Sequence, residues 1–385
     1  MESGSPTDVE RIRQPQDERG RLAPPRTRPA ESLPLIEKAV RTLLFSLLVA
    51  SLLSACGREP QLTHHRLAAF GTEVTITLHA KNDTPEAIAA IDREFQRMHR
   101  QWHAWEPGRL ADINQAIAED REITLSAETI EIIRHARELE AASGGLFNPA
   151  IGRLLSQWGF HASDLPDGPP PPEARVAKMV EQAPSMSDLE LGDETVSSSN
   201  PAVQLDFGAY IKGVAVARAL DILVGAGVEH AIVNAGGDLG VIGRRGSRPW
   251  RAAVQHPDGE GGHYLAGLNV EDGEFVFTSG NYRRYRQGEG IRHGHIVDPR
   301  NGYPADQVSS VTVIASEGGR ADAAATALAV AGAEEWGRVA RDLSVERVMR
   351  VDADGTIHVT AAMADRLHWR EQPGSVRVTS LPESR

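Results

Sequence analysis

Strand-like and helix-like segments follow one another irregularly between residues 70 and 331, and this order most constrains the fold. Alternating β-branched residues predict strands, and apolar residues at helical spacing predict helices. The expected strands are 70–78, 203–206, 231–235, 250–255, 275–278 and 308–314, and the expected helices are 85–105, 126–139, 209–224 and 321–331. Because no regular strand-helix-strand repeat connects them, the pattern favours one large mixed α/β domain of the α+β class over a doubly wound sheet.

The length and charge of the chain limit its partners. With 385 residues and a formal net charge of -12, it can bury a large core but has no basic face for a nucleic acid. A small anionic cofactor is still allowed if a metal ion or a few basic side chains neutralise it. The proline-rich stretch 164–173 predicts a surface loop within the domain, or else a linker between two domains.

An apolar run at residues 42–53 precedes the single cysteine, Cys56. The run is short for a membrane span but suits a signal peptide, and the Leu-Ser-Ala-Cys sequence ending at Cys56 resembles a bacterial lipobox, whose cysteine is lipidated. We expect a disordered leader with a lipoprotein signal peptide at 1–55, a lipid-anchored tether at 56–66 and the folded domain at 67–380. The protein would then face the periplasm of a bacterial cell envelope; the alternative is a buried N-terminal helix with an incidental cysteine.

The segment Arg-His-Gly-His-Ile-Val-Asp-Pro-Arg-Asn-Gly at 292–302 places imidazoles and a carboxylate on a strand that runs into a turn. Alternating histidines point to one face of a strand, so His293, His295 and Asp298 could form a transition-metal site. A general base, His295, beside an orienting acid, Asp298, is the interpretation that we favour.

Asp322 and Thr326 share one face of the helix expected at 321–331. Their oxygen atoms could both reach one small hard cation such as Mg²⁺. The alternative is that Asp322 caps the helix and Thr326 bonds back to a main-chain carbonyl.

The segment 206–213, Asp-Phe-Gly-Ala-Tyr-Ile-Lys-Gly, places Asp206 at a strand end and Lys212 at a helix start, where anions bind well. An ordinary capped turn with a solvated lysine is the alternative. The Gly-Gly-Asp-Leu-Gly run at 236–240 is expected to be a tight turn, because no dinucleotide or P-loop glycine motif occurs in the sequence.

The order of motifs along the chain resembles that of the ApbE family of flavin transferases. These motifs are Phe-Gly-Thr, Trp-x-Pro, Asp-Ile-Asn, Phe-Asn-Pro-Ala-Ile-Gly, Trp-Gly-Phe, Asp-x-Gly-Ala-x-x-Lys-Gly, Asn-Ala-Gly-Gly-Asp, Thr-Ser-Gly-Asn-Tyr, His-Ile-Val-Asp-Pro-Arg-x-Gly and Ala-Asp-Ala-x-Ala-Thr-Ala. The resemblance covers residues 67–332. Phe70, Asn148, Asn301 and Ala324 depart from the residues usual in the family, which are Met, Asp, Thr and a larger apolar residue.

The resemblance implies the fold of that family and its activity, the Mg²⁺-dependent transfer of FMN from FAD to a threonine or serine hydroxyl, with release of AMP. The acceptor would be an exported or membrane flavoprotein, such as a subunit of a sodium-pumping or Rnf-type respiratory complex. The same site could instead hydrolyse FAD to FMN and AMP, or bind FAD without turnover.

The resemblance also assigns roles to individual residues. The Mg²⁺ ligands would be the Ala209 carbonyl, Asp322 and Thr326, and His295 would be the catalytic histidine. The residues implied to bind the flavin are Phe70, Trp105, Phe147, Asn148, Pro149, Asp206, Lys212 and Ile296.

Overall fold

A central sheet carries the site. In the computed structural model, which describes residues 40–42, 61–82, 84–257, 263–282, 284–288 and 290–381, nine strands form it in the order β1-β2-β6-β7-β10-β13-β14-β15-β17. The strands are β1 Leu62–Ala69, β2 Thr72–His79, β6 Ala231–Ala235, β7 Asp238–Ile242, β10 Phe275–Gly280, β13 Val308–Ala315, β14 Arg347–Asp352, β15 Ile357–Thr360 and β17 Val376–Thr379. Neighbours are antiparallel, except that β15 and β17 are parallel.

Smaller sheets flank the central one. They pair β16 Leu367–Trp369 with β9 Tyr264–Val270 and β8 Trp250–Gln255, β3 Ile123–Thr124 with β5 Thr195–Ser198 and β4 Leu189–Leu191, and β11 Tyr285–Gly288 with β12 Ile291–Gly294. The proline-rich stretch packs against this last hairpin, because the Gly168 N-H donates to the Gln287 carbonyl and Arg286 donates to the carbonyls of Gly168 and Pro169. It is therefore a loop of the same domain.

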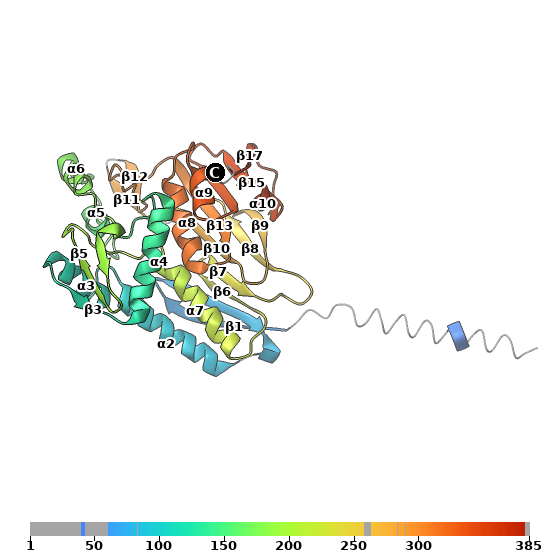
Figure 1. The fold of residues 1–385 in the computed structure, drawn as a ribbon. Helices are drawn as coiled ribbons and strands as arrows, with labels where there is room; N and C mark the ends of the chain where they lie inside the picture. The colour runs from blue at the N-terminus through green and yellow to red at the C-terminus, as the bar shows by residue number, and fades with distance from the viewer. Residues whose placement is uncertain are drawn as a thin grey trace, which may run out of the picture. The chain divides into compact units, whose positions relative to one another are not determined.

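Helices pack against the central sheet, against a smaller sheet and against one another. They are η1 Ala80–Asn82, α2 Pro85–Trp102, α3 Arg109–Ala118, α4 Ala127–Ser143, α5 Gly152–Gln157, α6 Glu173–Glu181, η2 Met186–Asp188, α7 Ile211–Gly225, α8 Gly318–Val330, α9 Trp336–Asp342 and α10 Ala361–Ala364. In Figure 1, α2, α7 and α8 lie together, with α7 against β6 and β7 and α8 against β10 and β13. The expected mixed α+β architecture in one large domain is confirmed.

Two glycines bring α7 and α8 into backbone contact. A Cβ atom on Gly213 would lie 2.1 Å from the Gly318 carbonyl oxygen, and one on Gly318 would lie 2.3 Å from that of Gly213. No larger residue fits at either position. The start of α7, with Lys212, consequently lies beside Asp322 of α8.

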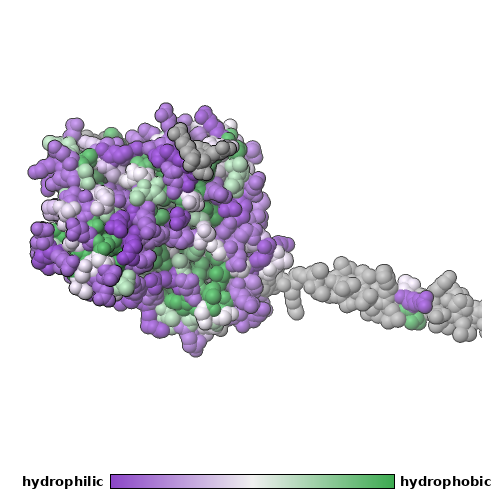
Figure 2. All heavy atoms as spheres, viewed as in Figure 1, coloured by the Kyte–Doolittle hydropathy of each residue, from purple (hydrophilic) through white to green (hydrophobic). Residues whose placement is uncertain are grey.

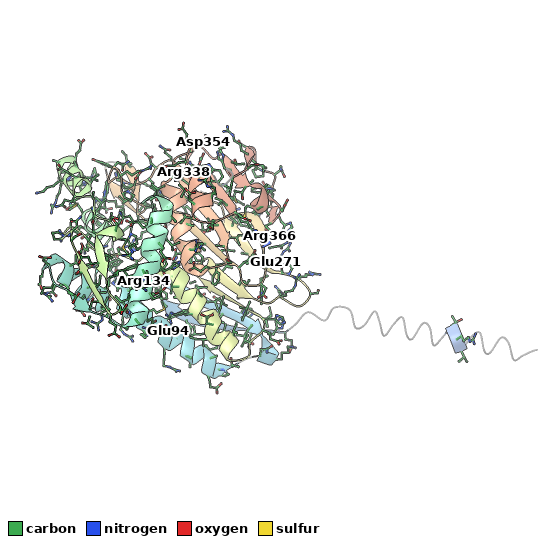
Figure 3. The ribbon with its side chains drawn as sticks, in the orientation of Figure 1. Glu94, Arg134, Glu271, Arg338, Asp354 and Arg366 are labelled. Atoms are coloured by element: carbon green, nitrogen blue, oxygen red, sulfur yellow. The ribbon has the colours of Figure 1, made fainter. Side chains whose placement is uncertain are left out.

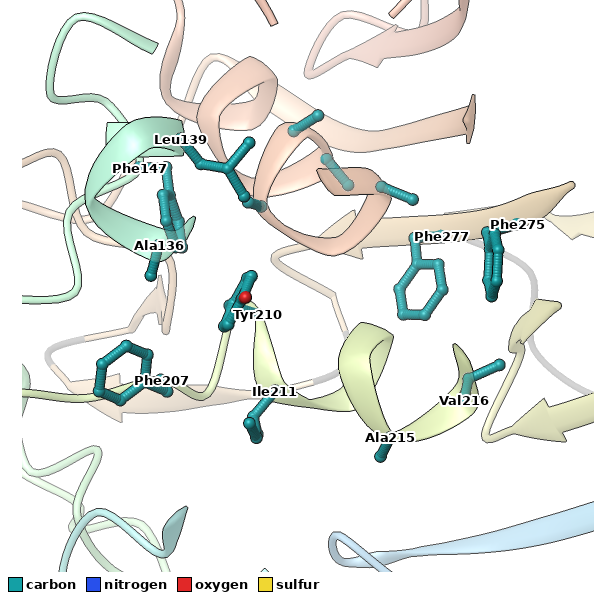
Figure 4. Close-up of a cluster of buried hydrophobic side chains, with 14 of the residues drawn as sticks. Ala136, Leu139, Phe147, Phe207, Tyr210, Ile211, Ala215, Val216, Phe275 and Phe277 are labelled. Atoms are coloured by element: carbon teal, nitrogen blue, oxygen red, sulfur yellow. The ribbon is translucent and has the colours of Figure 1, made fainter. Parts of the chain in front are cut away.

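Buried aromatic residues hold the helices above the sheet. In Figure 4, Phe147, Ala136 and Leu139 lie on one side of Tyr210, and Phe275 and Phe277 lie near Val216 of α7. Phe147, Tyr210 and Phe277 are each at most 2% exposed. Burying aromatic side chains of this size makes a large contribution to stability.

Three sequence predictions differ from the structure. Phe70 and Gly71 do not belong to a strand, because both have positive φ (52° and 70°) and form the tight turn between β1 and β2. Residues 203–206 make a single bridge, between Gln204 and Ile151, rather than a strand. The folded part begins earlier than residue 67, because β1 includes 62–66 of the expected tether.

Hydrophilic side chains dominate the face in Figure 2, with smaller apolar areas, one of them over α7. Figure 3 labels charged residues on three of the helices, Glu94 of α2, Arg134 of α4 and Arg338 of α9. Among the residues that the structure describes, no helix is both long enough and apolar enough to cross a membrane.

Candidate active site

A cavity of about 720 Å³ lies where the first turns of α7 and α8 meet the ends of α2, β10 and β12. It brings together residues from distant parts of the sequence. Eleven of the expected site residues line it: Phe70, Trp105, Phe147, Asn148, Asp206, Ala209, Lys212, His295, Ile296, Asp322 and Thr326. Pro149 is buried beside them, and Cys56 lies outside the described residues.

Asp322 and Thr326 lie on the cavity side of α8. The N-cap of this helix is Glu317, which accepts a hydrogen bond from the Arg320 N-H, so the interpretation of Asp322 as the cap is wrong. Instead, Oδ2 of Asp322 accepts a hydrogen bond from the Gly213 N-H at 3.0 Å. One turn later, the Thr326 hydroxyl lies 3.0 Å from the Ser279 hydroxyl.

Two buried carboxylates share this end of the cavity. The Lys212 ammonium pairs with Oδ2 of Asp238, whose Oδ1 accepts a hydrogen bond from the Thr278 N-H at 2.9 Å. The pKa of Asp322 is raised from 3.8 to about 7, mainly because the group is buried; the charge of Lys212 opposes this rise and the charge of Asp238 adds to it. The site therefore carries more acidic groups than its single ammonium balances.

An oxygen-only site of this kind fits Mg²⁺. Carboxylate, hydroxyl and main-chain carbonyl oxygens are its usual protein ligands, and it keeps several waters or phosphate oxygens besides. The described residues include no group of three or more histidine, cysteine or acidic side chains that could hold a metal ion by themselves. The same observation removes the transition-metal interpretation of His293, His295 and Asp298, and the His293 ring lies against Trp158 instead, with centroids 5.4 Å apart.

His295 follows β12 and is fixed by one main-chain group. Its Nδ1 lies 3.1 Å from the Arg284 carbonyl oxygen, which can only accept, so Nδ1 carries the proton and Nε2 keeps its lone pair. Burial lowers the pKa of His295 to about 4, and the nearby charges of Arg284 and Lys212 lower it too. The imidazole is therefore neutral at pH 7 and able to accept a proton at Nε2.

Asp298 does not orient His295, because its carboxylate binds Arg300. Its Oδ1 accepts hydrogen bonds from the Arg300 backbone N-H and Nε at 2.9 Å, and its Oδ2 accepts from the guanidinium at 2.7 Å. The carboxylate holds the Asp-Pro-Arg turn, and the Arg284 carbonyl takes the orienting role expected of Asp298.

In a second part of the cavity, which we call the Asp206 end, both carboxylate oxygens of Asp206 are paired. Oδ1 accepts from the Gly208 N-H at 2.7 Å, and Oδ2 lies 2.8 Å from Nε2 of His161. Burial by itself raises the pKa of Asp206, but the hydrogen bond and charge of His161 outweigh it, so that the pKa is lowered. Asp206 is not a helix cap, because α7 begins only at Ile211. Lys212 is not simply solvated, because its ammonium pairs with Asp238.

Aromatic and apolar side chains form the wall beside Asp206. Trp105 is 37% exposed, whereas Phe147 and Ile296 are buried. The guanidinium of Arg284 lies over the Trp105 ring, 5.4 Å from its centroid. Because part of the indole is exposed, Trp105 is suited to contact a flat aromatic ligand.

Among the cavity residues to which the sequence predictions gave no role are His161, Asp238, Ser279 and Arg284. Asp238 and Ser279 occur within motifs, Gly-Gly-Asp and Thr-Ser-Gly, whose recurrence with the other motifs is a usable signal. His161 and Arg284 carry no such signal, because their partners are far away in the sequence.

Comparison with known proteins places the chain in a family. Residues 70–349 match the model of the ApbE family. An FAD:protein FMN transferase of Rhodobacter capsulatus is 42% identical over 318 residues, which are 82% of this chain and 60% of that protein. One from Treponema pallidum is 27% identical over 81% of this chain and 91% of its own length.

Solved structures agree with this placement. The ApbE protein of Thermotoga maritima has a TM-score of 0.72 and 28% identity, and it covers 81% of this chain and 100% of its own. The flavin transferase ApbE of Vibrio cholerae has a TM-score of 0.70 and 25% identity, with 80% and 100% covered. The fold expected from the resemblance is thus confirmed, and the chain belongs to the ApbE family.

Proposed function

We propose that this chain is an FAD:protein FMN transferase, which moves FMN from FAD to a threonine or serine hydroxyl of an acceptor protein and releases AMP. The observation that carries the proposal is one cavity in which a neutral imidazole, an ammonium and a set of oxygen ligands face an aromatic wall. The names of the relatives support the same activity.

The two parts of the cavity suit the flavin ring and the pyrophosphate of FAD. Trp105, Phe147 and Ile296 offer an apolar surface to the flavin ring. Lys212 and the oxygen ligands at the other end suit the pyrophosphate. A cavity of about 720 Å³ is within the range, about 300–1,000 Å³, that encloses one such ligand.

The reaction is a displacement at phosphorus. The acceptor hydroxyl oxygen bonds to the phosphorus of the FMN half, and the bond from that phosphorus to the bridging oxygen breaks, so that AMP leaves with the electron pair. Nε2 of His295 takes the hydroxyl proton, while the Arg284 carbonyl holds the ring through Nδ1. Lys212 provides positive charge beside the phosphates.

Mg²⁺ would be held by the Ala209 carbonyl, the Asp322 carboxylate and the Thr326 hydroxyl. When bound, it neutralises charge on the pyrophosphate and on the departing AMP. Its binding would also relieve the excess of acidic groups beside Lys212, which is the physical reason to expect a cation here.

A single assay tests the proposal. The purified chain is incubated with FAD, Mg²⁺ and a candidate acceptor, and protein-bound flavin fluorescence is measured in a denaturing gel together with AMP release. The proposal expects both signals, and both should disappear with EDTA. AMP without protein-bound flavin for every acceptor would show an FAD pyrophosphatase, and FAD binding without AMP would show a non-catalytic flavin protein.

We further propose that Cys56 carries a lipid anchor and that the chain acts at the periplasmic side of a bacterial membrane on an exported or membrane flavoprotein, such as a Rnf-type subunit. The support is the lipobox-like sequence before Cys56. Metabolic labelling with a fatty acid tests the anchor: wild-type protein should be labelled and Cys56→Ser should not. Equal labelling of the two would contradict it.

A further inference from the structure

His161 contacts two of the residues that we propose bind the flavin. Its Nε2 lies 2.8 Å from Oδ2 of Asp206. Its ring stacks on the indole of Trp105, with centroids 5.4 Å apart and an angle of 22° between the planes. The imidazole of His161 thus contacts both a polar and an aromatic residue of the same cavity wall.

This histidine is itself held in place. Its side chain is 7% exposed and that of Asp206 is 10% exposed, so that water competes little for their hydrogen bond. Arg284 donates to the carbonyl of Phe160 at 2.8 Å and to that of Ala162 at 2.7 Å, one on each side of His161. The backbone around the imidazole is therefore fixed from within the cavity.

The pairing also fixes the plane of the Asp206 carboxylate. Oδ1 is oriented by the Gly208 N-H at 2.7 Å and Oδ2 by His161, so that neither oxygen is free to turn. Hydrogen bonds to a buried charged group are stronger than those between neutral groups. Without His161, the carboxylate could rotate, and the indole of Trp105 would lose the ring that stacks on it.

We infer that His161 is a positioning residue of the flavin site, which sets the orientation of Asp206 by hydrogen bonding and that of Trp105 by stacking. It need not touch the flavin or the phosphorus. The inference rests on the proposed function, because it takes the ligand of this wall to be the flavin ring of FAD.

Two substitutions separate the two contacts. His161→Phe keeps a ring against Trp105 but removes the donor to Asp206, and we expect it to weaken FAD binding about tenfold, as for one charged hydrogen bond. His161→Gln keeps a donor but removes the ring, and we expect about a threefold loss. His161→Ala removes both contacts and should weaken binding by about the product of the two.

The chain offers a matched control. His358 also pairs with an aspartate, its Nε2 lying 3.3 Å from Asp352, and it also neighbours a tryptophan, Trp336. It does not line the cavity. His358→Phe should bind FAD within twofold of wild type, so that it measures what the loss of a His-Asp pair does to the fold alone.

The experiment measures the Kd for FAD of the full chain by flavin fluorescence in EDTA, where no turnover occurs, together with the Tm of each variant. Weaker binding by His161→Phe than by His358→Phe at similar Tm supports the inference. Wild-type affinity in all three His161 variants would overturn it. If the phenylalanine variant does not fold, His161→Gln and His161→Ala decide by the same criterion.

The same measurement separates this inference from the proposed function. A wild-type chain that does not bind FAD would overturn both. FAD binding that depends on His161, in a chain that never transfers FMN, would leave the positioning role standing and remove only the activity.

Discussion

The two ends of the cavity each contain a buried carboxylate, but they treat it in opposite ways. Asp206 has a partner for each oxygen, Gly208 and His161, and its pKa is lowered. Asp322 shares its surroundings with a second carboxylate, Asp238, and burial raises its pKa to about 7. Groups of the protein balance the charge of Asp206 at one end, whereas at the other end they do not balance the combined charge of Asp322 and Asp238.

The difference indicates what each end is built to bind. A carboxylate whose charge is already balanced can accept a hydrogen bond from a neutral ring without a further ion. A carboxylate whose pKa is raised by burial is stabilised in its ionised form when a cation binds beside it. We therefore assign the Asp206 end to the flavin ring and the Asp322 end to Mg²⁺ and the pyrophosphate.

The largest effect is expected from Asp322→Asn. The change removes a proposed Mg²⁺ ligand, and FMN transfer should fall at least about 10²-fold, as when a group that stabilises transition-state charge is lost. The metal-free protein should become more stable at pH 8. A pKa raised from 3.8 to about 7 means that ionised Asp322 destabilises the fold by at most about 4 kcal/mol above pH 7, a cost that asparagine does not carry.

The transfer assay and thermal unfolding in EDTA check both parts of this prediction. Asp206→Asn is the matched comparison, because that carboxylate has a lowered pKa and its loss should decrease stability at pH 8. A rise in Tm for Asp206→Asn, or a fall for Asp322→Asn, would reverse the contrast between the two ends.

The next largest effect concerns His295→Ala. Loss of a general base costs about 10²–10⁴-fold, so the transfer rate should fall by that amount while FAD affinity changes little. Because the pKa of His295 is about 4, the imidazole stays neutral from pH 8 to pH 5 in the free protein. Wild-type kcat/KM, measured from pH 5 to pH 8 with MgCl₂ saturating at every pH, should therefore show no loss from protonation of His295 near its ordinary pKa of 6.5.

His293→Ala is the control for this variant, because His293 packs on Trp158 and does not line the cavity. A rate for His295→Ala within twofold of that for His293→Ala would remove His295 from the mechanism.

A smaller effect is expected in the pH dependence of Mg²⁺ binding. Below about pH 7, Mg²⁺ must displace a proton from Asp322, so its apparent affinity should fall by up to about tenfold per pH unit as the pH decreases. Above pH 7 the carboxylate is ionised and the affinity should level off. Thermal-shift titrations with MgCl₂ at pH 6, 7 and 8 measure this, and equal affinities at the three values would contradict it.

The smallest effect is expected from Asn148→Asp, which restores the residue usual in the family. The Asn148 Nδ2 donates to the Pro184 carbonyl at 2.9 Å, and a carboxylate cannot make this hydrogen bond. The loss should cost about 1 kcal/mol of stability, seen as a lower midpoint in urea unfolding. An unchanged midpoint would show that the carbonyl finds another donor.

The sequence predicts one end of the cavity better than the other. Asp322, Thr326 and Lys212 fall in motifs with helical spacing, and the fold brings them together at the contact of Gly213 with Gly318. His161 pairs with Asp206 across 45 residues, a contact that no local pattern encodes. The same limit explains Asp298, whose closeness to His295 in sequence suggested a pair, although Arg300 binds its carboxylate.

The helices and strands show a related difference. Most expected elements form because their apolar periodicity matches one buried face. The turn at Phe70 and Gly71 forms because both residues have positive φ. The alternation of side chains along the sequence carries no information on φ, so it could not predict this turn. The segment 203–206 pairs with the backbone of residues 149–152, but because this partner enters helix α5 at Gly152, the pairing forms one bridge and not a strand.

The measurement that tests the central claim most directly is intact-mass spectrometry of an acceptor protein incubated with FAD, Mg²⁺ and either wild-type chain or Asp322→Asn. We predict that the wild-type chain adds the mass of FMN less one water to the acceptor, that EDTA prevents the addition, and that the variant adds at least about 10²-fold less in the same time. Addition at equal rates by the wild-type chain and the variant would contradict the assignment of the Asp322 end to the metal and the pyrophosphate.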